Sequence, residues 1–465
     1  MLESYSQVDL RKKPRRPLTS TLDVINTLHC VAIRRPFAVS ETTLHYLVVT
    51  TGTTGDIHPF MCIAKSLQAL GRKVTFITNA FHAHLIQSAG LPFVGLGTNE
   101  EYLRAVANPD LWDPTKGVST LRATYSDQLK QIDEAIHSVS LQAHQVVIAH
   151  PFAVPGAVIA RERGFIKSVV AAYLAPSNLR TCHDPLNIGP TSVPRWAPLS
   201  WRRALWRFVE KGWIDPVAVA QINAARKPLG LPQVHSFLTH IAEAPDLSVT
   251  LFPSWFAPVV PDWPRPLIEG DFQLLEAGTQ HGFTENLSTF LAAGEKPIVF
   301  TFGTGNLHAA DCFACALSAI NRLGRRAIFL TKERTQIPAH LPESVLWQPY
   351  VPLSALLPHT AALVHHGGIG TTAEALRSGT PQLITPFAWD QFDNGARIAS
   401  LGAGMVTPAK RLRSLKLARS LQTLTTSDTI RARCSQLAIR FMPPHEPTTL
   451  CQEVERLVLS EHNDV

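Results

Sequence analysis

The stretch 362–374 reads ALVHHGGIGTTAE, and it decides the fold. A short apolar run predicts a buried strand, the glycines after it predict a turn, and the residues that follow predict a helix. Backbone N–H groups at such a helix start, together with the positive end of the helix dipole, favour a diphosphate. Glycines let a ligand approach the backbone closely, and His366 would add a donor to a phosphate oxygen. The alternative is a tight turn in which His366 only caps the helix.

Strand–turn–helix units also surround this stretch in the second half of the chain. The runs expected as strands are 297–302, 327–330, 344–347, 362–365 and 382–385, the last of which closes the set. The first of these strands ends in the turn 303–306, and a helix then runs to about Leu323. Strands that alternate with helices predict a parallel sheet.

The first half of the chain repeats this pattern. Residues 45–50 predict a strand, and 51–56 predict a turn rich in glycine and threonine. Apolar residues then recur at helical spacing up to Gly71, which ends the helix. The further runs expected as strands are 73–77, 146–149 and 168–172. This half therefore predicts a second parallel sheet.

Length and composition predict two domains. The chain has 465 residues, of which 45% are apolar and 17% charged, so most of it should fold into two buried cores. The expected parts are an N-terminal arm at 1–43, an N-terminal Rossmann-like domain at 44–270, a C-terminal Rossmann-like domain at 271–440 and a C-terminal helix at 441–465. The segment 251–267 contains five prolines, and it is expected to connect the domains together with the region of Gly270. Ligands bind at the carboxyl ends of parallel strands, so the cleft between the domains is the expected site.

The arm carries the only dense basic cluster, at 11–16. Because residues 1–43 are basic and polar without a clear period, they are expected to be disordered; a membrane-surface tether and a wrongly chosen start codon are the alternatives. The formal net charge of +7 allows an anionic partner. The other basic residues are spread through the chain, so nucleic acid is not expected. A nucleotide diphosphate or an acidic membrane surface fits better.

The seven cysteines are odd in number and scattered, which does not predict a disulfide framework. Cys312 and Cys315 form a lone C-x-x-C in an apolar helical segment, so packing is favoured over a metal or redox site. No apolar run reaches the roughly 18 residues of a membrane span, and the N-terminus lacks a secretory signal. A cytoplasmic protein is expected, with peripheral contact at the inner membrane face as a further alternative.

A carboxylate lies in the first turn, where the stretch 53–59 reads TTGDIHP. Asp56 would lie at the tip of this turn and face the cleft, where it could take a proton from an acceptor hydroxyl. The alternative is that Asp56 only caps the following helix, although the two roles are compatible. His58 is a competing base.

A third polar segment, 386–394, reads PFAWDQFDN and follows a predicted strand. Its Asp390 could accept hydrogen bonds from neighbouring sugar hydroxyls, while Gln391 could both donate and accept. The alternative role of Asp390 is to cap the next helix.

Together these three segments resemble the GT-B-fold glycosyltransferases, which include plant and bacterial UDP-glycosyltransferases and sterol glucosyltransferases. The resemblance runs from about Leu44 to about Met405, and it rests on H-x-G-G-x-G-T followed by D-Q-x-x-N, and on T-x-G-D-x-x-P in the first turn. It implies an α/β fold of two Rossmann-like domains that face a central cleft. The most similar branch is that of the bacterial rhamnosyltransferases of rhamnolipid synthesis. The segments that carry this likeness are 108–114, 222–226 with 230–231, and 251–258 with 262–264.

The resemblance assigns roles to individual residues, with an acceptor site in the first domain and a nucleotide-sugar site in the second. Asp56 takes the place of the catalytic base, where many plant relatives have His. Tyr350 and Val351 fall where an aromatic ring stacks on the nucleobase, and Trp347 is the alternative for that ring. The other donor-binding positions are Gly55, Thr304, His366, Gly368, Gly370 and Thr371 around the diphosphate, Glu374 at the ribose, and Asp390 with Gln391 at the sugar. No metal and no cofactor are expected.

The implied activity is an inverting, metal-independent transfer of a hexose onto the hydroxyl of a hydrophobic acceptor. Kinship with the rhamnosyltransferase branch favours dTDP-L-rhamnose as the donor and a 3-(3-hydroxyalkanoyloxy)alkanoate as the acceptor. Glu374 favours UDP-glucose, since a carboxylate can accept from both hydroxyls of a ribose and a dTDP-sugar lacks the 2′-hydroxyl. The acceptor would then be a lipid, a sterol or another hydrophobic molecule. Two further alternatives are an epimerase of the same fold, which needs no acceptor, and an inactive sugar-nucleotide-binding partner protein.

Overall fold

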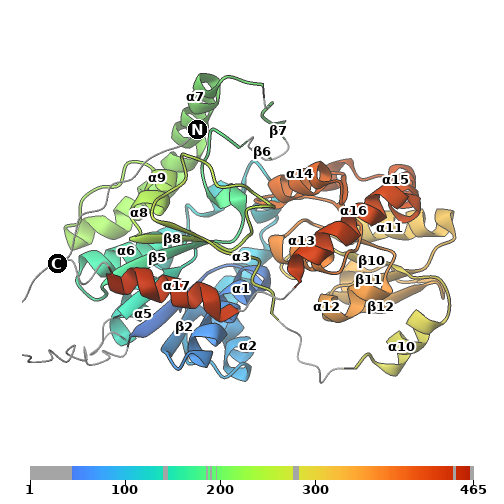
Figure 1. Ribbon diagram of the computed structural model, residues 1–465, viewed down its shortest axis with the longest axis horizontal. Coiled ribbons are helices and arrows are strands. Elements are labelled where there is room, and N and C mark those ends of the chain that lie inside the picture. Colours follow the sequence, from blue (N-terminus) through green and yellow to red (C-terminus); the bar gives the residue numbers. More distant parts are fainter. Residues whose placement is uncertain are drawn as a thin grey trace, which may run out of the picture. The chain divides into compact units, whose positions relative to one another are not determined.

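The computed structural model describes residues 44–139, 145–184, 187–188, 191–194, 196–275, 282–442 and 447–460. The predicted arm, with its basic cluster, lies outside the described residues. The described residues form two large parallel sheets and a small antiparallel pair, β6 (Asn187–Ile188) with β7 (Thr191–Ser192) (Figure 1). The predicted α/β class with two Rossmann-like sheets is confirmed.

The first large sheet has seven parallel strands in the order β3-β2-β1-β4-β5-β8-β9. Their bounds are β1 His45–Val49, β2 Lys73–Asn79, β3 Phe93–Leu96, β4 Gln145–Ala149, β5 Ser168–Tyr173, β8 Leu247–Thr250 and β9 Leu267–Glu269. Every residue of β1 is buried, as expected for a parallel strand covered on both faces. The four strands predicted in this half are confirmed; β3, β8 and β9 are short and were not predicted.

The second large sheet has six parallel strands in the order β12-β11-β10-β13-β14-β15. Their bounds are β10 Ile298–Thr301, β11 Ala327–Leu330, β12 Val345–Gln348, β13 Ala362–His365, β14 Gln382–Ile384 and β15 Gly404–Val406. The five predicted strands are confirmed, but the prediction that β14 closes the set is wrong, because β15 pairs with it. A Cβ on Gly404 would lie 2.2 Å from the Gln382 carbonyl oxygen, so glycine is required where this strand begins.

The strands of the second sheet end level with one another. Thr301 of β10 pairs with His365 of β13, and His365 pairs with Ile384 of β14. The turns that follow these three strands therefore lie side by side at the carboxyl edge, which is where ligands bind in such sheets.

Helices connect the strands in both halves. Those of the first half are α1 Thr54–Ala69, α2 Ala83–Ser88, α3 Asn99–Ala107, α4 Gly117–Thr120, α5 Tyr125–Val139, α6 Val154–Glu162, α7 Leu199–Val209, α8 Asp215–Arg226 and α9 Phe237–Glu243. Those of the second half are α10 Glu285–Ala292, α11 Ala310–Leu323, α12 Leu353–Leu356, α13 Ile369–Arg377, α14 Gln391–Leu401, α15 Ser414–Thr426, α16 Asp428–Ala438 and α17 Pro447–Ser460. None of the helices within the described ranges is both long and apolar enough to span a bilayer.

The sequence predicted that 251–267 and the region of Gly270 connect the two domains. The prediction holds for Gly270, which follows the last strand of the first sheet, but it is wrong for 251–267. It is a loop within the first sheet, since it joins β8 to β9 and these strands pair in parallel. Its Phe252, Phe256 and Trp263 are buried in the core of the first half. Prolines exclude regular structure from this segment but do not exclude burial, so its breakers indicated a loop and not a domain boundary.

The C-terminal helix α17 returns to the first sheet and packs on α1 (Figure 1). Glu455 of α17 forms an ion pair with Arg72 at 2.9 Å, and the Cys451 thiol lies 3.7 Å from the Ile63 carbonyl oxygen. The chain therefore crosses between the two sheets twice.

Candidate active site

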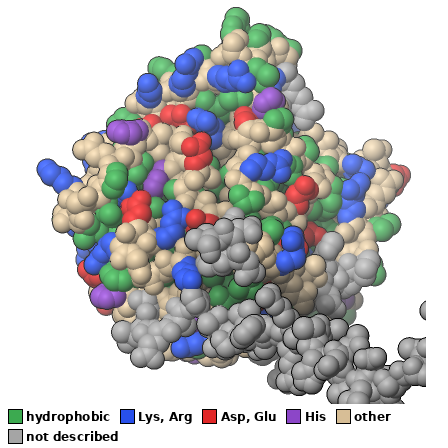
Figure 2. Space-filling model, turned by 60° about the vertical axis from the view of Figure 1, so that its left-hand side comes forward, with side chains coloured by type: hydrophobic (Ala, Val, Ile, Leu, Met, Phe, Trp, Pro, Cys, Tyr) green, Lys and Arg blue, Asp and Glu red, His purple; other side chains and the backbone are tan. Residues whose placement is uncertain are grey.

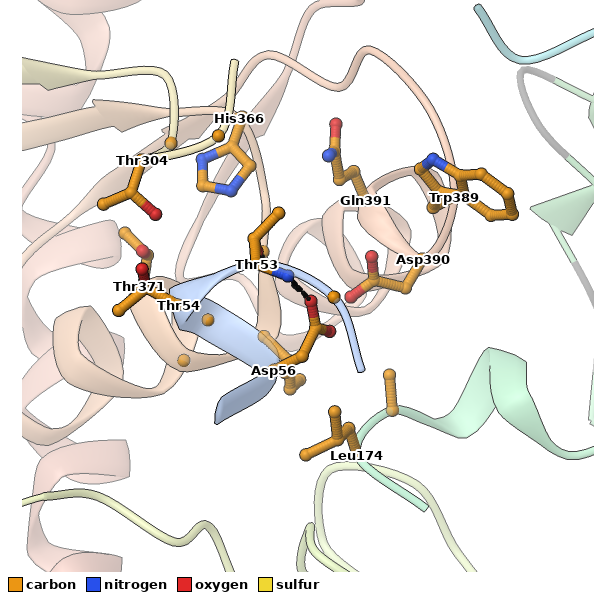
Figure 3. A pocket seen from close by; sticks show the side chains of 18 of the residues that line it. Thr53, Thr54, Asp56, Leu174, Thr304, His366, Thr371, Trp389, Asp390 and Gln391 are labelled. Carbon is orange, nitrogen blue, oxygen red and sulfur yellow. Dashed lines mark hydrogen bonds between the residues drawn. The ribbon is translucent and has the colours of Figure 1, made fainter. Parts of the chain in front are cut away.

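A cavity of about 730 Å³ opens at the carboxyl ends of strands from both large sheets (Figure 3). It is lined by every residue that the sequence assigned to catalysis or donor binding, but not by Trp347, the alternative for stacking on the base. The assigned residues are Gly55, Asp56, Thr304, Tyr350, Val351, His366, Gly368, Gly370, Thr371, Glu374, Asp390 and Gln391.

The turn after β1 touches the turn after β10. A Cβ on Gly305 would lie 2.7 Å from the methyl carbon of Thr53, so glycine is needed for this approach. The contact places the start of α1, which carries Asp56, beside the turn that carries Thr304 (Figure 3).

Asp56 lies in the first turn of α1 and is held by the residue before that helix. Its Oδ2 accepts a hydrogen bond from the Thr53 backbone N–H at 2.8 Å and one from the Thr53 hydroxyl at 3.2 Å (Figure 3). The capping role that the sequence left open is therefore present. Both bonds use Oδ2, and no other described residue donates a hydrogen bond to Oδ1, so this oxygen is open to a ligand in the cavity. The two roles are compatible, as the sequence suggested.

Burial raises the pKa of the Asp56 carboxyl to about 6, although the bonds from Thr53 act in the opposite direction. A carboxylate with a pKa near neutrality accepts a proton more readily than an ordinary one, which suits a general base. His58, the competing base, also lines the cavity, and burial lowers its pKa. His58 is therefore neutral at pH 7, and it remains a second proton acceptor in this wall.

Asp390 does not cap its helix by a side-chain hydrogen bond, unlike the alternative left open by the sequence. It occupies the N-cap position of α14, yet its carboxylate accepts from the Asn394 side-chain amide at 2.7 Å. Burial, and after it the negative charge of Asp56, raise the pKa of Asp390 to about 7. The two carboxylates therefore interact across the cavity from different sheets.

Trp389 anchors the segment 386–394 to the first half of the chain. Sequence reasoning gave this residue no role. Its φ of 56° is rare for a bulky residue and is strained. Its indole N–H donates to the Leu111 carbonyl at 2.9 Å, and its ring lies so close to Gly117 that a Cβ there would be 3.0 Å away. These contacts hold the strained residue and so orient the adjacent Asp390. Nothing in the sequence indicates a positive φ at a tryptophan.

Gln391 can only donate to a ligand, which corrects the prediction that it both donates and accepts. Its Oε1 already accepts from the backbone N–H groups of Phe387 at 2.8 Å and Ala388 at 3.2 Å. These two donors also fix the orientation of the amide, because a backbone N–H cannot accept. Asp390 and Gln391 thus offer the cavity one acceptor group and one donor group, and their side chains point in different directions (Figure 3).

The two histidines after β13 have different surroundings. His365 is fully buried; its Nδ1 accepts from the Gly367 N–H at 3.2 Å and its Nε2 lies 3.0 Å from the Gln382 side-chain oxygen. His366 lines the cavity, and its Nδ1 has no hydrogen-bond partner in the described part of the chain. Burial lowers the pKa of His366 to about 4, so its ring is neutral at pH 7. It would meet a phosphate as a neutral hydrogen-bond donor.

The helix after this turn begins without a capping side chain. Gly368 is the N-cap of α13; no side-chain hydrogen bond caps this helix among the described residues, and its first turn holds no acidic residue. Gly367 has a φ of 99°, and a Cβ on it would lie 2.7 Å from the Ile384 side chain. The start of α13 lines the cavity from Gly368 to Thr371, and the backbone N–H groups of a helix start suit an anion.

Glu374 and Tyr350 line the part of the cavity that the second sheet and its helices form, which we call the donor half. Glu374 forms an ion pair with Arg377 at 2.8 Å, and both side chains are partly buried. Burial raises the pKa of Tyr350, and the charge of Glu374 adds to this effect, so the two side chains are near each other. The Tyr350 side chain is exposed, at 59% of its surface, which leaves its ring available for stacking.

Trp347, the alternative for stacking on a base, is engaged elsewhere. Its indole N–H donates to the Thr331 carbonyl at 2.9 Å, its ring packs against the core of the second half, and the Arg334 guanidinium lies 5.6 Å from the ring centroid. It is not among the residues that line the cavity, whereas Tyr350 is. The geometry favours Tyr350.

Asn306 and Lys332 are among the polar residues of the donor half that sequence reasoning missed. The Nδ2 of Asn306 is buried and has no partner among the described residues, while its Oδ1 accepts from the His308 N–H at 2.9 Å. Lys332 is the only lysine or arginine among the described residues of the cavity wall. Asn306 ends the quoted turn 303–306 and could have been found there. A bound diphosphate would thus be met mainly by N–H groups and not by basic side chains.

The described part of the chain holds no group of three or more His, Cys, Asp or Glu side chains placed to bind a metal ion. Cys312 and Cys315 lie on α11, where Cys312 is buried in the core of the second half.

The first-sheet half of the cavity is largely apolar. The side chains that give it this character come mainly from α4, the π-helical turn 210–214 and α7 to α9. They include Leu111, Trp112, Val118, Leu121, Phe152, Trp206, Val209, Trp213, Phe237, Leu238 and Ile241. Asp56 lies between this half and the polar donor half, so a hydroxyl on an apolar molecule could reach its carboxylate.

Two protein families match this chain, one in each half. Residues 46–179 match the glycosyltransferase family 28 N-terminal domain. Residues 316–457 match the C-terminal domain of the erythromycin biosynthesis protein CIII-like family. The chain is a glycosyltransferase of the GT-B fold, an enzyme of the hexosyltransferase class.

Curated relatives agree with this class, and solved structures share the fold. The chain is 25% identical over 438 residues to a sterol 3-beta-glucosyltransferase of Debaryomyces hansenii, which covers 87% of this chain but only 26% of that longer protein. It is 27% identical over 404 residues to the O-mycaminosyltylonolide 6-deoxyallosyltransferase of Streptomyces fradiae, with 84% of this chain and 92% of that protein covered. The spinosyn rhamnosyltransferase SpnG, solved with thymidine diphosphate, shares the fold at a TM-score of 0.61 and 20% identity, covering 88% of this chain and 100% of that one.

Proposed function

We propose that this enzyme transfers a hexose, with inversion and without a metal, from a nucleotide diphosphate to the hydroxyl of a hydrophobic acceptor. One observation carries the proposal. The carboxylate of Asp56, which has a free Oδ1 and a pKa near 6, and the side-chain-uncapped start of α13 line the same cavity. An apolar wall lies on one side of Asp56 and a polar wall on the other.

The reaction is a single displacement. The Asp56 carboxylate takes the proton of the acceptor hydroxyl while the oxygen of that hydroxyl attacks the anomeric carbon of the sugar. The bond from that carbon to the diphosphate breaks, and the diphosphate leaves with the bonding electrons. Its new charge is met by the N–H groups of α13 and by His366, whose dipoles are already oriented before the reaction. Asp390 and Gln391 would hold hydroxyls of the sugar, the first accepting and the second donating.

For the donor we propose dTDP-L-rhamnose and for the acceptor a 3-(3-hydroxyalkanoyloxy)alkanoate. The support is the resemblance of the segments 108–114, 222–226 and 251–258 to the bacterial rhamnosyltransferases of rhamnolipid synthesis. The chain also shares the fold of a rhamnosyltransferase that was solved with thymidine diphosphate. The apolar wall formed by Phe237, Leu238 and their neighbours suits an acyl chain.

UDP-glucose is the second candidate, and Glu374 is the observation that favours it. This carboxylate lines the donor half near Tyr350 and forms an ion pair with Arg377 at 2.8 Å. A ribose with both hydroxyls would give it two donors. A relative named as a sterol glucosyltransferase matches most of this chain, so a sterol or another lipid would be the acceptor in that case.

Calorimetry of the purified protein with dTDP-rhamnose and UDP-glucose, in the presence of a metal chelator, tests the donor. Binding of dTDP-rhamnose at least about 10-fold tighter supports the rhamnosyl assignment, and the reverse preference supports the glucosyl assignment. Product analysis with a hydroxyacyl ester and with a sterol then tests the acceptor. Donor binding without any product would indicate an inactive sugar-nucleotide-binding protein, and a sugar product formed without acceptor would indicate an epimerase. Loss of donor binding on chelation would contradict metal independence.

A further inference from the structure

Helix α7 (Leu199–Val209) has two different apolar faces. Its inner face contributes Trp206, which is 8% exposed and lines the acceptor half of the cavity. The Trp206 indole N–H donates to the Thr181 carbonyl at 2.7 Å, so this side chain is fixed in place. Val209 and Trp213, which follow on the same helical stretch, line the cavity as well.

The outer face of α7 is also apolar, but it is in water. Trp201, Leu205 and Phe208 recur at the i, i+4, i+7 spacing of a single helix face, and they are 65%, 38% and 76% exposed. Trp196, just before the helix, is 79% exposed. We call these four residues the α7 apolar face. Large aromatic side chains that gather on one exposed face mark a binding surface, whereas single exposed apolar residues do not.

Basic residues flank the α7 apolar face. Arg203 and Arg207 lie one turn apart and are exposed, and the exposed Lys211 follows them. Neither arginine forms an ion pair within the described ranges. Figure 2 shows Lys and Arg side chains among hydrophobic ones at its upper end, where α7 lies in Figure 1. The patch is therefore both apolar and positively charged.

These features together fit an anionic lipid surface. Tryptophan is favoured at the level of lipid headgroups, where its ring is apolar and its N–H stays hydrated. Arginines beside an apolar helix face are attracted to anionic lipids and so complement the surface that the face would enter. The opposite side of the same helix lines the acceptor half of the cavity, so a molecule leaving the lipid at α7 would be next to Trp206.

We propose that the α7 apolar face enters an anionic lipid surface and brings the acceptor end of the cavity to it. The substrate class this implies is an acceptor that resides in lipid, and this part rests on the proposed function. The lipid-binding part does not, because it depends only on the exposed residues of α7.

Sedimentation with vesicles of phosphatidylcholine, with or without phosphatidylglycerol, tests the lipid contact in the full-length protein. The Trp201→Ser/Phe208→Ser variant should bind the anionic vesicles about 10-fold more weakly or worse, since it removes the two most exposed rings of the helix. An Arg203→Gln/Arg207→Gln variant should lose binding to anionic vesicles in particular. The control is Ile439→Ser/Met442→Ser, which removes two side chains that are 66% and 75% exposed elsewhere and should leave binding unchanged.

Equal vesicle binding by the unsubstituted protein and the Trp201→Ser/Phe208→Ser variant would overturn the proposal. So would a change from dimer to monomer in that variant with unchanged vesicle binding, because the face would then be a contact between two copies. Circular dichroism checks that each variant is folded.

The acceptor route is tested separately by activity. With a lipid acceptor in vesicles, the Trp201→Ser/Phe208→Ser variant should lose about 10-fold in turnover, but it should keep its turnover on a short, soluble acceptor. Equal loss on both acceptors would contradict the route. If no acceptor is glycosylated even by the unsubstituted protein, the proposed function fails while the vesicle result stands by itself.

Discussion

The turn after β1 and the turn after β13 have the same local design and opposite chemistry. Each is rich in glycine, follows a buried strand and starts a helix. In the first turn the chain supplies its own anion, because Asp56 accepts from the Thr53 N–H at 2.8 Å. In the second turn Gly368 is the N-cap, and no described side chain caps the helix.

This difference shows how one motif can position a proton acceptor in one place and bind the charge of a leaving group in another. A helix start that holds a carboxylate of its own chain positions a proton acceptor. A helix start without one leaves N–H groups and a positive dipole for the charge of a ligand. The acidic residue at the third helical position of α1, and its absence from the first turn of α13, decide between the two outcomes.

The largest expected effect follows from removing the charge of the first turn. Asp56→Asn should lower kcat by about 10²- to 10⁴-fold, because the amide cannot take the acceptor proton. Nucleotide binding should stay nearly intact, since an Asn oxygen can still accept from Thr53 and the α13 turn is unchanged. Steady-state kinetics and calorimetry with the nucleotide diphosphate measure the two quantities. Full activity in this variant would remove the base assignment, and His58→Gln is then the next variant to examine.

The second effect compares one glycine in each turn. A Cβ on Gly370 would meet no protein atom within 4 Å, so Gly370→Ala should fold normally while its methyl group projects beside the diphosphate site. We expect its nucleotide dissociation constant to rise about 10-fold. Gly55→Ala, whose Cβ would lie 3.7 Å from the Thr53 hydroxyl, should change that constant by less than about 2-fold, because Asp56 already accepts from the N–H of Thr53 in this turn; this expectation departs from the donor-binding role that the resemblance gives Gly55. Equal weakening in both variants, measured by calorimetry, would mean that the first turn also contacts the diphosphate.

A third prediction concerns pH. With its pKa raised to about 6, Asp56 is protonated and inactive below that pH, so kcat/KM should rise as pH increases through about 6. His366, whose pKa is lowered to about 4, stays neutral over this range and adds no second step. Asp390, whose pKa is raised to about 7, should add a second change near that pH. Asp390→Asn should lose this second change and keep the rising limb near pH 6, whereas residual activity of Asp56→Asn should lack that limb. A pH profile of kcat/KM for the three proteins tests whether the rising limb near pH 6 belongs to Asp56. If Asp56→Asn retains this limb, the limb belongs to another titrating group.

The smallest effect is expected at Glu374. Glu374→Gln should weaken UDP binding by about 3- to 5-fold and dTDP binding less, because the carboxylate can accept from two hydroxyls of a ribose and from one of a deoxyribose. Calorimetry with both nucleotides measures this. Arg377→Met serves as the control, since it breaks the ion pair with Glu374 but keeps the carboxylate. Identical losses for UDP and dTDP would show that Glu374 does not contact the 2′-hydroxyl.

The sequence predicted the strands that carry the site better than the edges of the sheets. β1, β10 and β13 are central, strongly apolar runs followed by glycine turns, so local pattern and tertiary environment agree. β9 and β15 are three-residue edge strands next to proline or glycine, and their pairing depends on neighbours far away in the chain. The loop 251–267 was misread for the same reason, since its burial comes from tertiary contacts.

By itself the sequence determined the class of fold, the two turns and the residue types gathered at the cavity, because these follow from periodicity, glycine and the chemistry of each side chain. Only the tertiary structure decided how those side chains are used. The side-chain oxygen of Gln391 accepts a hydrogen bond from a backbone N–H, and Trp389 has a positive φ. One face of α7 lines the cavity while the other is exposed to water. The physical reason is that hydrogen-bond partners, burial and pKa values depend on atoms from distant parts of the chain, which no local pattern records.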